Sequence, residues 1–259
     1  MNQLPTSVVP SYPSNDLNFW RDWFASFNIV IQSLISTPLW TGVIVASIVL
    51  QAFQIPFVGS FVSLVQMIAG LFILAIIIRN TYCTIVPGAA GRTELFPQSV
   101  ELKMFGVNFL IGLGTMFLFW FFIIPAIWFA VIHALALEFV VLENCGVMEA
   151  MSKSRQLMKG NIWRLIGYTW AWPIAINIGI LIVFGIIGAT AYFTMGIDKS
   201  EAAQSLFKNI FMAGLMAVCL PLGYTIRSLA ARAFVAFMHD AGQTTAVEQQ
   251  MQSIKSTDF

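Results

Sequence analysis

Residues 143–160 have the sequence ENCGVMEAMSKSRQLMKG and form the one charged, regularly patterned segment between long apolar runs. Within it, apolar side chains recur along one face of a helix, and acidic and basic side chains occupy the other. Glu149 and Lys153 are spaced as a favourable i to i+4 ion pair, and Gly160 follows at the position where helices commonly stop. The segment therefore predicts an amphipathic helix over 147–159.

The composition on either side of this helix defines the class of protein. Hydrophobic residues make up 58% of the 259 residues and charged residues only 10%, against roughly 45–50% and about 25% in soluble domains. Several runs approach or exceed the roughly 20 apolar residues that a helix needs to cross a bilayer. These runs do not alternate as the strands of a membrane barrel do. We therefore expect an all-α membrane protein.

Six apolar segments are predicted to span the membrane. They cover about 39–53, 57–78, 104–124, 126–142, 162–194 and 206–226. We expect a single transmembrane domain over 16–240, with a mobile tail at 1–15 and a polar tail at 241–259. The fifth segment is either one span kinked at Pro173 or an interfacial turn followed by a span that begins near Trp172.

A second amphipathic segment precedes the first span. Between 16 and 36, aromatic residues such as Trp20 and Phe24 recur at helical spacing, and polar residues such as Asp22 and Ser33 lie largely away from them. The aromatic face and modest hydrophobicity suit a helix that lies in the bilayer interface. We expect helix 147–159 to lie in the same way on the inner leaflet.

The distribution of basic residues sets the orientation. With six spans and both termini inside, eleven of the thirteen Lys and Arg residues lie on the cytoplasmic side, and only Lys199 and Lys208 lie outside. Basic residues favour the cytoplasmic side of short loops. We therefore expect a multi-pass protein of the bacterial cytoplasmic (inner) membrane with both termini in the cytoplasm.

Four basic residues near helix 147–159 are candidates for contact with lipid head groups or a partner: Lys153, Arg155, Lys159 and Arg164. Near an anionic surface each such cation contributes on the order of 1 kcal/mol of attraction. The alternative is that these cations only fix the topology and anchor the helix.

Ionisable residues within or near the predicted spans form a second set of candidates: His133, Glu138, Arg227 and Arg232. Burying such groups in hydrocarbon is costly unless they find partners. His133 and Glu138 are five positions apart, so they point about 140° away from each other on a helix. Glu138 and Arg227 both lie near cytoplasmic ends and are expected to pair, either as a structural ion pair or as part of a proton or substrate relay.

The sequence contains no recognisable catalytic or metal-binding set. His133 and His239 are the only histidines, and Cys83, Cys145 and Cys219 lack the C-x-x-C spacing of metal or redox sites. No P-loop or dinucleotide-binding turn is present, and a net charge of +1 gives no general attraction to nucleic acid. We expect no catalytic residue, no metal, no cofactor and three free thiols.

One pattern follows directly on the fourth apolar segment, and its residues are Glu143, Gly146, Glu149-Ala150, Ser154, Leu157, Gly160 and Trp163. This pattern resembles one shared by loosely related bacterial membrane families. They include the YciC-like inner-membrane proteins and the membrane domain found ahead of glycerophosphodiester phosphodiesterase catalytic domains. The resemblance implies a six-span fold in the cytoplasmic membrane and no catalytic residue. The ending Phe237-Met238-His239-Asp240 departs from the pattern.

The leading hypothesis is a non-enzymatic accessory or scaffolding protein of the bacterial envelope. It contacts inner-leaflet lipids, anionic ones among them, or a protein partner, or a second copy of itself. The alternative is a small transporter or lipid-translocating protein with a polar path near His133, Glu138 and Arg227. An enzyme that acts on lipid head groups ranks third. A cavity that reaches those residues favours the transporter, and dense packing around them does not.

Overall fold

A computed structural model of the chain describes residues 17–52, 58–86, 89, 100–194, 201–242 and 249. The predicted tail at 1–15 and most of that at 241–259 lie outside the described residues. The described helices are α1 (Phe19–Ser36), α2 (Pro38–Ala52), α3 (Val58–Ile85), α4 (Glu101–Phe121), α5 (Ile123–Ile132), α6 (Ala136–Glu143), α7 (Val147–Met158), α8 (Ile162–Leu165), the π-helical η2 (Ile166–Ala171), α9 (Trp172–Thr194) and α10 (Glu201–Asp240).

The apolar helices are compatible with a multi-pass helical membrane protein. In the described part of the chain, five are long and apolar enough to cross a membrane: Val65–Ile85, Glu101–Phe121, Ile123–Glu143, Ile162–Thr194 and Phe207–Asp240. A bent pair formed by α1 and α2, which meet at 94°, makes a sixth if it is counted as one span. With 15 residues, α2 alone is about 22 Å long, which is short of the roughly 30 Å of hydrocarbon.

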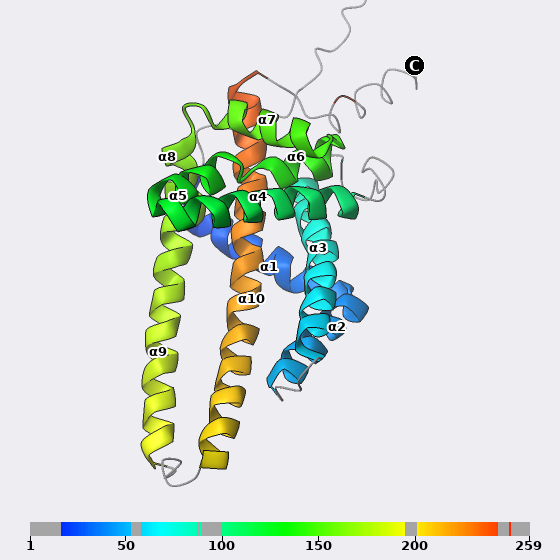
Figure 1. Cartoon of the computed structure of the whole chain (residues 1–259). Helices are drawn as coiled ribbons and strands as arrows, with labels where there is room; N and C mark the ends of the chain where they lie inside the picture. Colours follow the sequence, from blue (N-terminus) through cyan, green and yellow to red (C-terminus); the bar gives the residue numbers. More distant parts are fainter. Residues whose placement is uncertain are drawn as a thin grey trace, which may run out of the picture.

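Helix α10 is the axis of the fold (Figure 1). Its 40 residues make it about 60 Å long, roughly twice the thickness of the hydrocarbon core. The side chains of its first half are exposed or half-buried, whereas residues 229–238 are buried on every side. We call α6, α7, α8 and the last turns of α10 (229–240) the cap. The predicted span 206–226 is thus one section of a longer helix that continues into the cap.

Helices α4 and α5 are separated at Phe122, whose backbone is extended (φ −155°, ψ 124°). Pro125 lies in the first turn of α5, where the missing N–H of proline leaves no helical hydrogen bond unmade. The predicted span 126–142 is interrupted by a turn at 133–135, after which α6 begins. The hydroxyl of Ser154 donates to the carbonyl of Ile132 (3.0 Å), which satisfies one of the acceptors left open where α5 ends.

The fifth apolar segment is helical from Ile162 to Thr194. Of the two alternatives that the sequence left open, the structure therefore has a single helix. Its irregularity is the π-helical turn η2, which ends just before α9 and Pro173. Proline cannot donate the backbone hydrogen bond of a regular helix, and π turns occur where the regular hydrogen-bond ladder is locally altered.

Helix α1 attaches to the rest of the molecule through its polar face. Asp22, Ser26 and Ser33 are buried, and the helix packs against α3 and α10. Trp20 and Phe24 are exposed on the other side, 51% and 67% respectively. These two aromatic side chains are thus largely uncovered, and the prediction that α1 lies in the bilayer interface stays a prediction. The polar face docks on protein instead of facing water.

A buried polar network holds α1 in place. The carboxylate of Asp22 accepts hydrogen bonds from the Tyr168 hydroxyl (2.7 Å) and from Arg21 Nε (3.2 Å). Arg232 Nη1 lies 3.8 Å from the same carboxylate, and Arg232 Nε donates to Ser26 Oγ (3.0 Å). Arg232, one of the intramembrane candidates, therefore joins α10 to α1 and, through Asp22, to η2.

Candidate functional site

The turn between α6 and α7 fixes α7 against the start of α4. Asn144 has a left-handed backbone (φ 54°), a conformation that asparagine tolerates better than most residues. Lys103 Nζ donates to the Asn144 carbonyl (3.0 Å) and to its Oδ1 (2.7 Å). A Cβ on Gly106 would lie 3.0 Å from Val147 Cγ2, so α4 and α7 approach closely at this glycine.

Lys153, at the centre of α7, is held between two carboxylates. Its Nζ lies 3.0 Å from Glu149 Oε1 and 3.4 Å from Glu143 Oε2, and it donates to Cys145 Sγ (3.2 Å). Burial by itself lowers the pKa of Lys153, but the hydrogen bonds to Glu149 and Cys145 and the charge of Glu143 raise it above its ordinary value. The hydrogen bond from Lys153 in turn lowers the pKa of Glu149. Lys153 stays charged at neutral pH, and these carboxylates neutralise it.

Arg164 is neutralised in the same way. Its Nη1 lies 2.9 Å from Asp240 Oδ2 at the end of α10 and 3.3 Å from Asn161 Oδ1. The guanidinium carbon is 5.2 Å from the ring centroid of Phe237, within the range of a cation–π contact. Arg164 thus binds α8 to α10.

Arg155 and Lys159 differ from these two cations. Both are exposed, and neither forms an ion pair with any residue that the structure describes. Arg155 lies in the last turn of α7 and Lys159 follows directly as its C-cap, so both charges belong to the same end of α7. Trp163, 78% exposed, follows on α8. The four predicted head-group candidates therefore divide into two engaged cations and two available ones.

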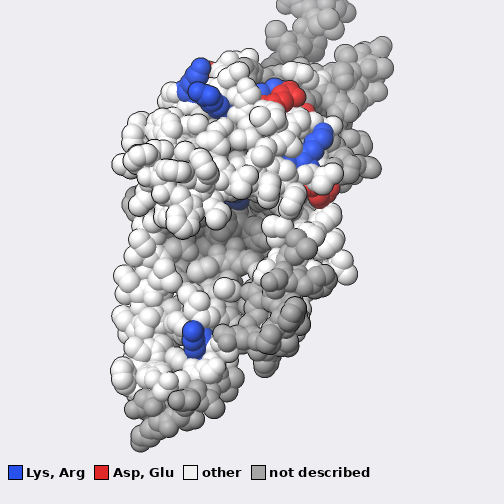
Figure 2. All heavy atoms as spheres, viewed as in Figure 1, with Lys and Arg blue, Asp and Glu red and all other residues white. Residues whose placement is uncertain are grey.

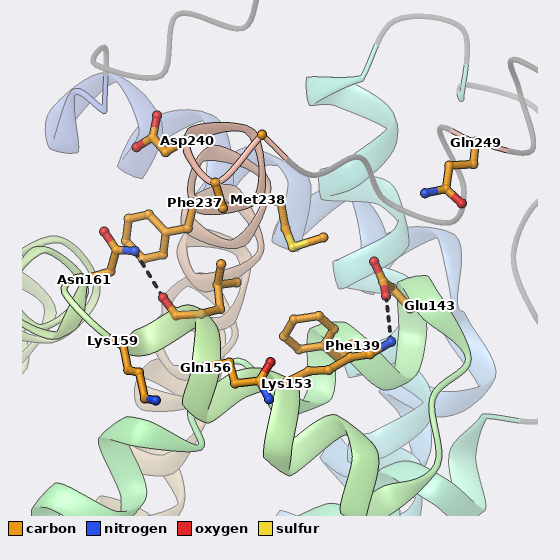
Figure 3. Close-up of a pocket in the computed structure, with 13 residues that line it drawn as sticks. Phe139, Glu143, Lys153, Gln156, Lys159, Asn161, Phe237, Met238, Asp240 and Gln249 are labelled. Carbon is orange, nitrogen blue, oxygen red and sulfur yellow. Dashed lines mark hydrogen bonds and ion pairs between the residues drawn. The ribbon is translucent and has the colours of Figure 1, made fainter.

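Among the described residues, the charged side chains of the visible face lie mainly near the cap, and few lie in the opposite half of that face (Figure 2). A pocket of about 760 Å³ opens at this end between α6, α7, the start of α8 and the end of α10 (Figure 3). Its polar lining consists of Glu143, Lys153, Gln156, Lys159, Asn161, Asp240 and Gln249. Phe139, Phe237 and Met238 supply apolar surface. Of its two lysines, Lys159 is the one without a carboxylate partner among the described residues.

The intramembrane candidates do not line this pocket. A ring nitrogen of His133 lies 2.9 Å from the Phe129 carbonyl one turn earlier, which is a contact within the same helix. The ion pair predicted between Glu138 and Arg227 is not formed. Arg227 Nη1 donates to the Ala134 carbonyl instead (3.2 Å), and both carboxylate oxygens of the fully buried Glu138 lack a hydrogen-bond partner.

Sequence reasoning missed the contribution of α10 to the pocket. Asp240 and Phe237 lie beyond the predicted end of the last span, and Asp240 is 76 residues from its partner Arg164. The available signal was the helical pattern that continues through Phe237 after the apolar run ends. Among the residues that the structure describes, no three His, Cys, Asp or Glu side chains are placed to hold a metal ion. The three cysteines are free.

Comparisons of the chain with models of protein families, with curated proteins and with solved structures find no match. The resemblance carried by residues 143–163 therefore stays a prediction, and the site is interpreted from its own geometry.

Proposed function

We propose that this chain is a non-enzymatic, multi-pass protein of the bacterial inner membrane that holds anionic lipid head groups at its cytoplasmic face, as an accessory or scaffolding component of the envelope. The observation that carries the proposal is the pair of available cations, Arg155 and Lys159, followed on α8 by the exposed indole of Trp163. Both cations precede the long apolar helix that begins at Ile162 and ends at Thr194.

The arrangement of the helices supports a cytoplasmic cap. The apolar helices follow one another in three pairs, α2–α3, α4–α5 and α9–α10. In the last pair, α9 leads away from the cap and α10 returns to it (Figure 1). If each pair enters the membrane and returns to the same side, the number of crossings is even. Both ends of the chain then lie on one side of the membrane. The preference of basic residues for the cytoplasm then favours the side that carries Arg155, Lys159 and Arg164.

The three side chains at the α7–α8 turn suit the head-group layer. Tryptophan is enriched at membrane–water interfaces because its ring is amphipathic. Each cation near an anionic surface contributes about 1 kcal/mol, so two available cations contribute about 2 kcal/mol, or roughly 30-fold in affinity. Lys153 and Arg164 add little because their charges are already matched by carboxylates.

The test is a titration of purified protein in detergent with short-chain phosphatidylglycerol and, separately, phosphatidylcholine. The double variant Arg155→Gln, Lys159→Gln is expected to bind phosphatidylglycerol roughly 30-fold more weakly, with no change for phosphatidylcholine. Lys159→Gln is compared with Lys208→Gln, which removes the same charge from an exposed position near the far end of α10. Only Lys159→Gln is expected to weaken binding, and an unchanged affinity in the double variant contradicts the proposal.

A further inference from the structure

Helices α4 and α5 form a hairpin that differs from the other apolar helices in its direction. The two helices pack against each other, and a Cβ on Gly114 would lie 2.7 Å from the ring of Phe129. Apart from α5, the main neighbours of α4 are α3, α6 and α7. In Figure 1 both helices lie across the direction of α3, α9 and α10, at the level where the cap begins.

The hairpin is apolar on all sides. No Asp, Glu, Lys or Arg occurs between Lys103 and Glu138. Its large side chains are among the most exposed in the molecule, such as Trp120 at 79% and Ile124 at 80%. A helix that is hydrophobic all round belongs in a protein core or in lipid, and little protein covers this one. Acyl chains are therefore the surroundings that fit it, as they are for the exposed apolar surface of α9.

The position of the bilayer along α10 places the hairpin at one membrane surface. Lys208 and Arg227 are 19 positions apart, or about 28 Å on a helix, which matches the roughly 30 Å hydrocarbon core. Beyond Arg227, α10 is buried mainly against α1 and α3, and its Phe234 contacts Phe139 of α6 with ring centroids 4.9 Å apart. Because α4 packs on α6 and α7, it lies beside this inner boundary.

We propose that α4 and α5 are inserted flat into the cytoplasmic leaflet and contact the acyl chains of that leaflet alone, instead of crossing the membrane. With 21 residues, α4 is about 31 Å long, so it is long enough either to cross the bilayer or to lie flat. Its direction relative to α10 distinguishes between these two arrangements. The hairpin then displaces lipid in one leaflet only, which makes it a wedge sensitive to lipid packing. A hairpin that lies flat removes two crossings, so the number of crossings is still even and both termini are still on the same side of the membrane.

Labelling of single cysteines tests where the tip of the hairpin lies. In a background with Ala at the three native cysteines, a membrane-impermeant maleimide is applied to spheroplasts that carry Phe122→Cys, Ser205→Cys or Ser152→Cys. Ser205, exposed at the start of α10, is expected to be labelled from outside, whereas the tip at Phe122 and Ser152 on α7 are not. External labelling of Phe122→Cys means that the hairpin crosses the membrane and overturns the proposal. External labelling of Ser152→Cys inverts the topology and contradicts the proposed function instead.

Spin-label depth measurements test the direction of α4 independently. Nitroxides are placed at exposed positions spaced along the helix, namely Phe105, Phe109, Leu113, Met116 and Trp120, in vesicles of phosphatidylethanolamine and phosphatidylglycerol. A flat helix puts all five labels at nearly the same depth, judged from collisions with oxygen and with a water-soluble nickel chelate. A crossing helix changes depth by about 1.5 Å per residue, so a depth that passes through a maximum along α4 overturns the proposal.

Discussion

Removal of the Asp22 carboxylate tests how α1 is attached to the protein. Asp22 is 2% exposed and Arg232 is 7% exposed, so Asp22→Ala leaves a buried guanidinium without its counter-charge. Breaking a buried ion pair by removing one partner costs about 3–5 kcal/mol. We therefore expect the free energy of unfolding to fall by about that amount. If the polar face of α1 faced water, the cost would be that of a surface substitution, within about 0.5 kcal/mol.

The measurement is equilibrium unfolding in maltoside micelles, followed by circular dichroism. Tyr168→Phe removes one hydrogen bond to the Asp22 carboxylate and is expected to cost about 1.5–3 kcal/mol. Because the two groups are in contact, the double variant is expected to cost less than the sum of the single variants.

The matched control is Asp240→Ala. It breaks the partly exposed ion pair with Arg164, for which about 0–1 kcal/mol is expected because solvent screens it. An Asp22→Ala cost no larger than that of Asp240→Ala refutes the view that the polar face of α1 is docked inside the protein.

Two further predictions concern packing and thiol chemistry. Gly188→Ala places a Cβ 2.6 Å from the Phe211 ring. This overpacking is expected to lower the free energy of unfolding by about 1–3 kcal/mol. Gly179→Ala meets nothing within 4 Å and is expected to leave stability unchanged or slightly raised. Burial raises the pKa of Cys145 above its ordinary 9.0, which lowers its thiolate fraction at neutral pH. Iodoacetamide is therefore expected to modify Cys145 more slowly than an exposed Ser152→Cys thiol at pH 7.5, with a rate that still rises above pH 9. Equal rates at pH 7.5 contradict this expectation.

The helix over 147–159 was predictable from its residues. The structure has α7 at Val147–Met158, with Gly160 at φ 86° just beyond it, because side-chain periodicity and a glycine stop are local properties of the chain. The all-α class and its apolar helices followed from composition, since in lipid only helices and closed barrels satisfy their own backbone groups.

The local ion pair of Glu149 with Lys153 was predictable from its i to i+4 spacing, but the polar contacts that join distant parts of the chain were not. Tyr168 and Asp22 are 146 positions apart, and Arg232 and Ser26 are 206 apart. Only the fold showed that Glu143 joins the pair of Glu149 and Lys153, and that Lys159 has no carboxylate partner among the described residues.

The direction of α4 and α5 also depends on tertiary structure. An apolar run indicates only that its surroundings are apolar. Acyl chains provide apolar surroundings whether the helix crosses the bilayer or lies flat within one leaflet. The sequence by itself therefore determined that these residues belong in lipid. Only their packing on α3, α6 and α7 decided the direction in which they run, because that packing fixes them relative to the long axis of α10.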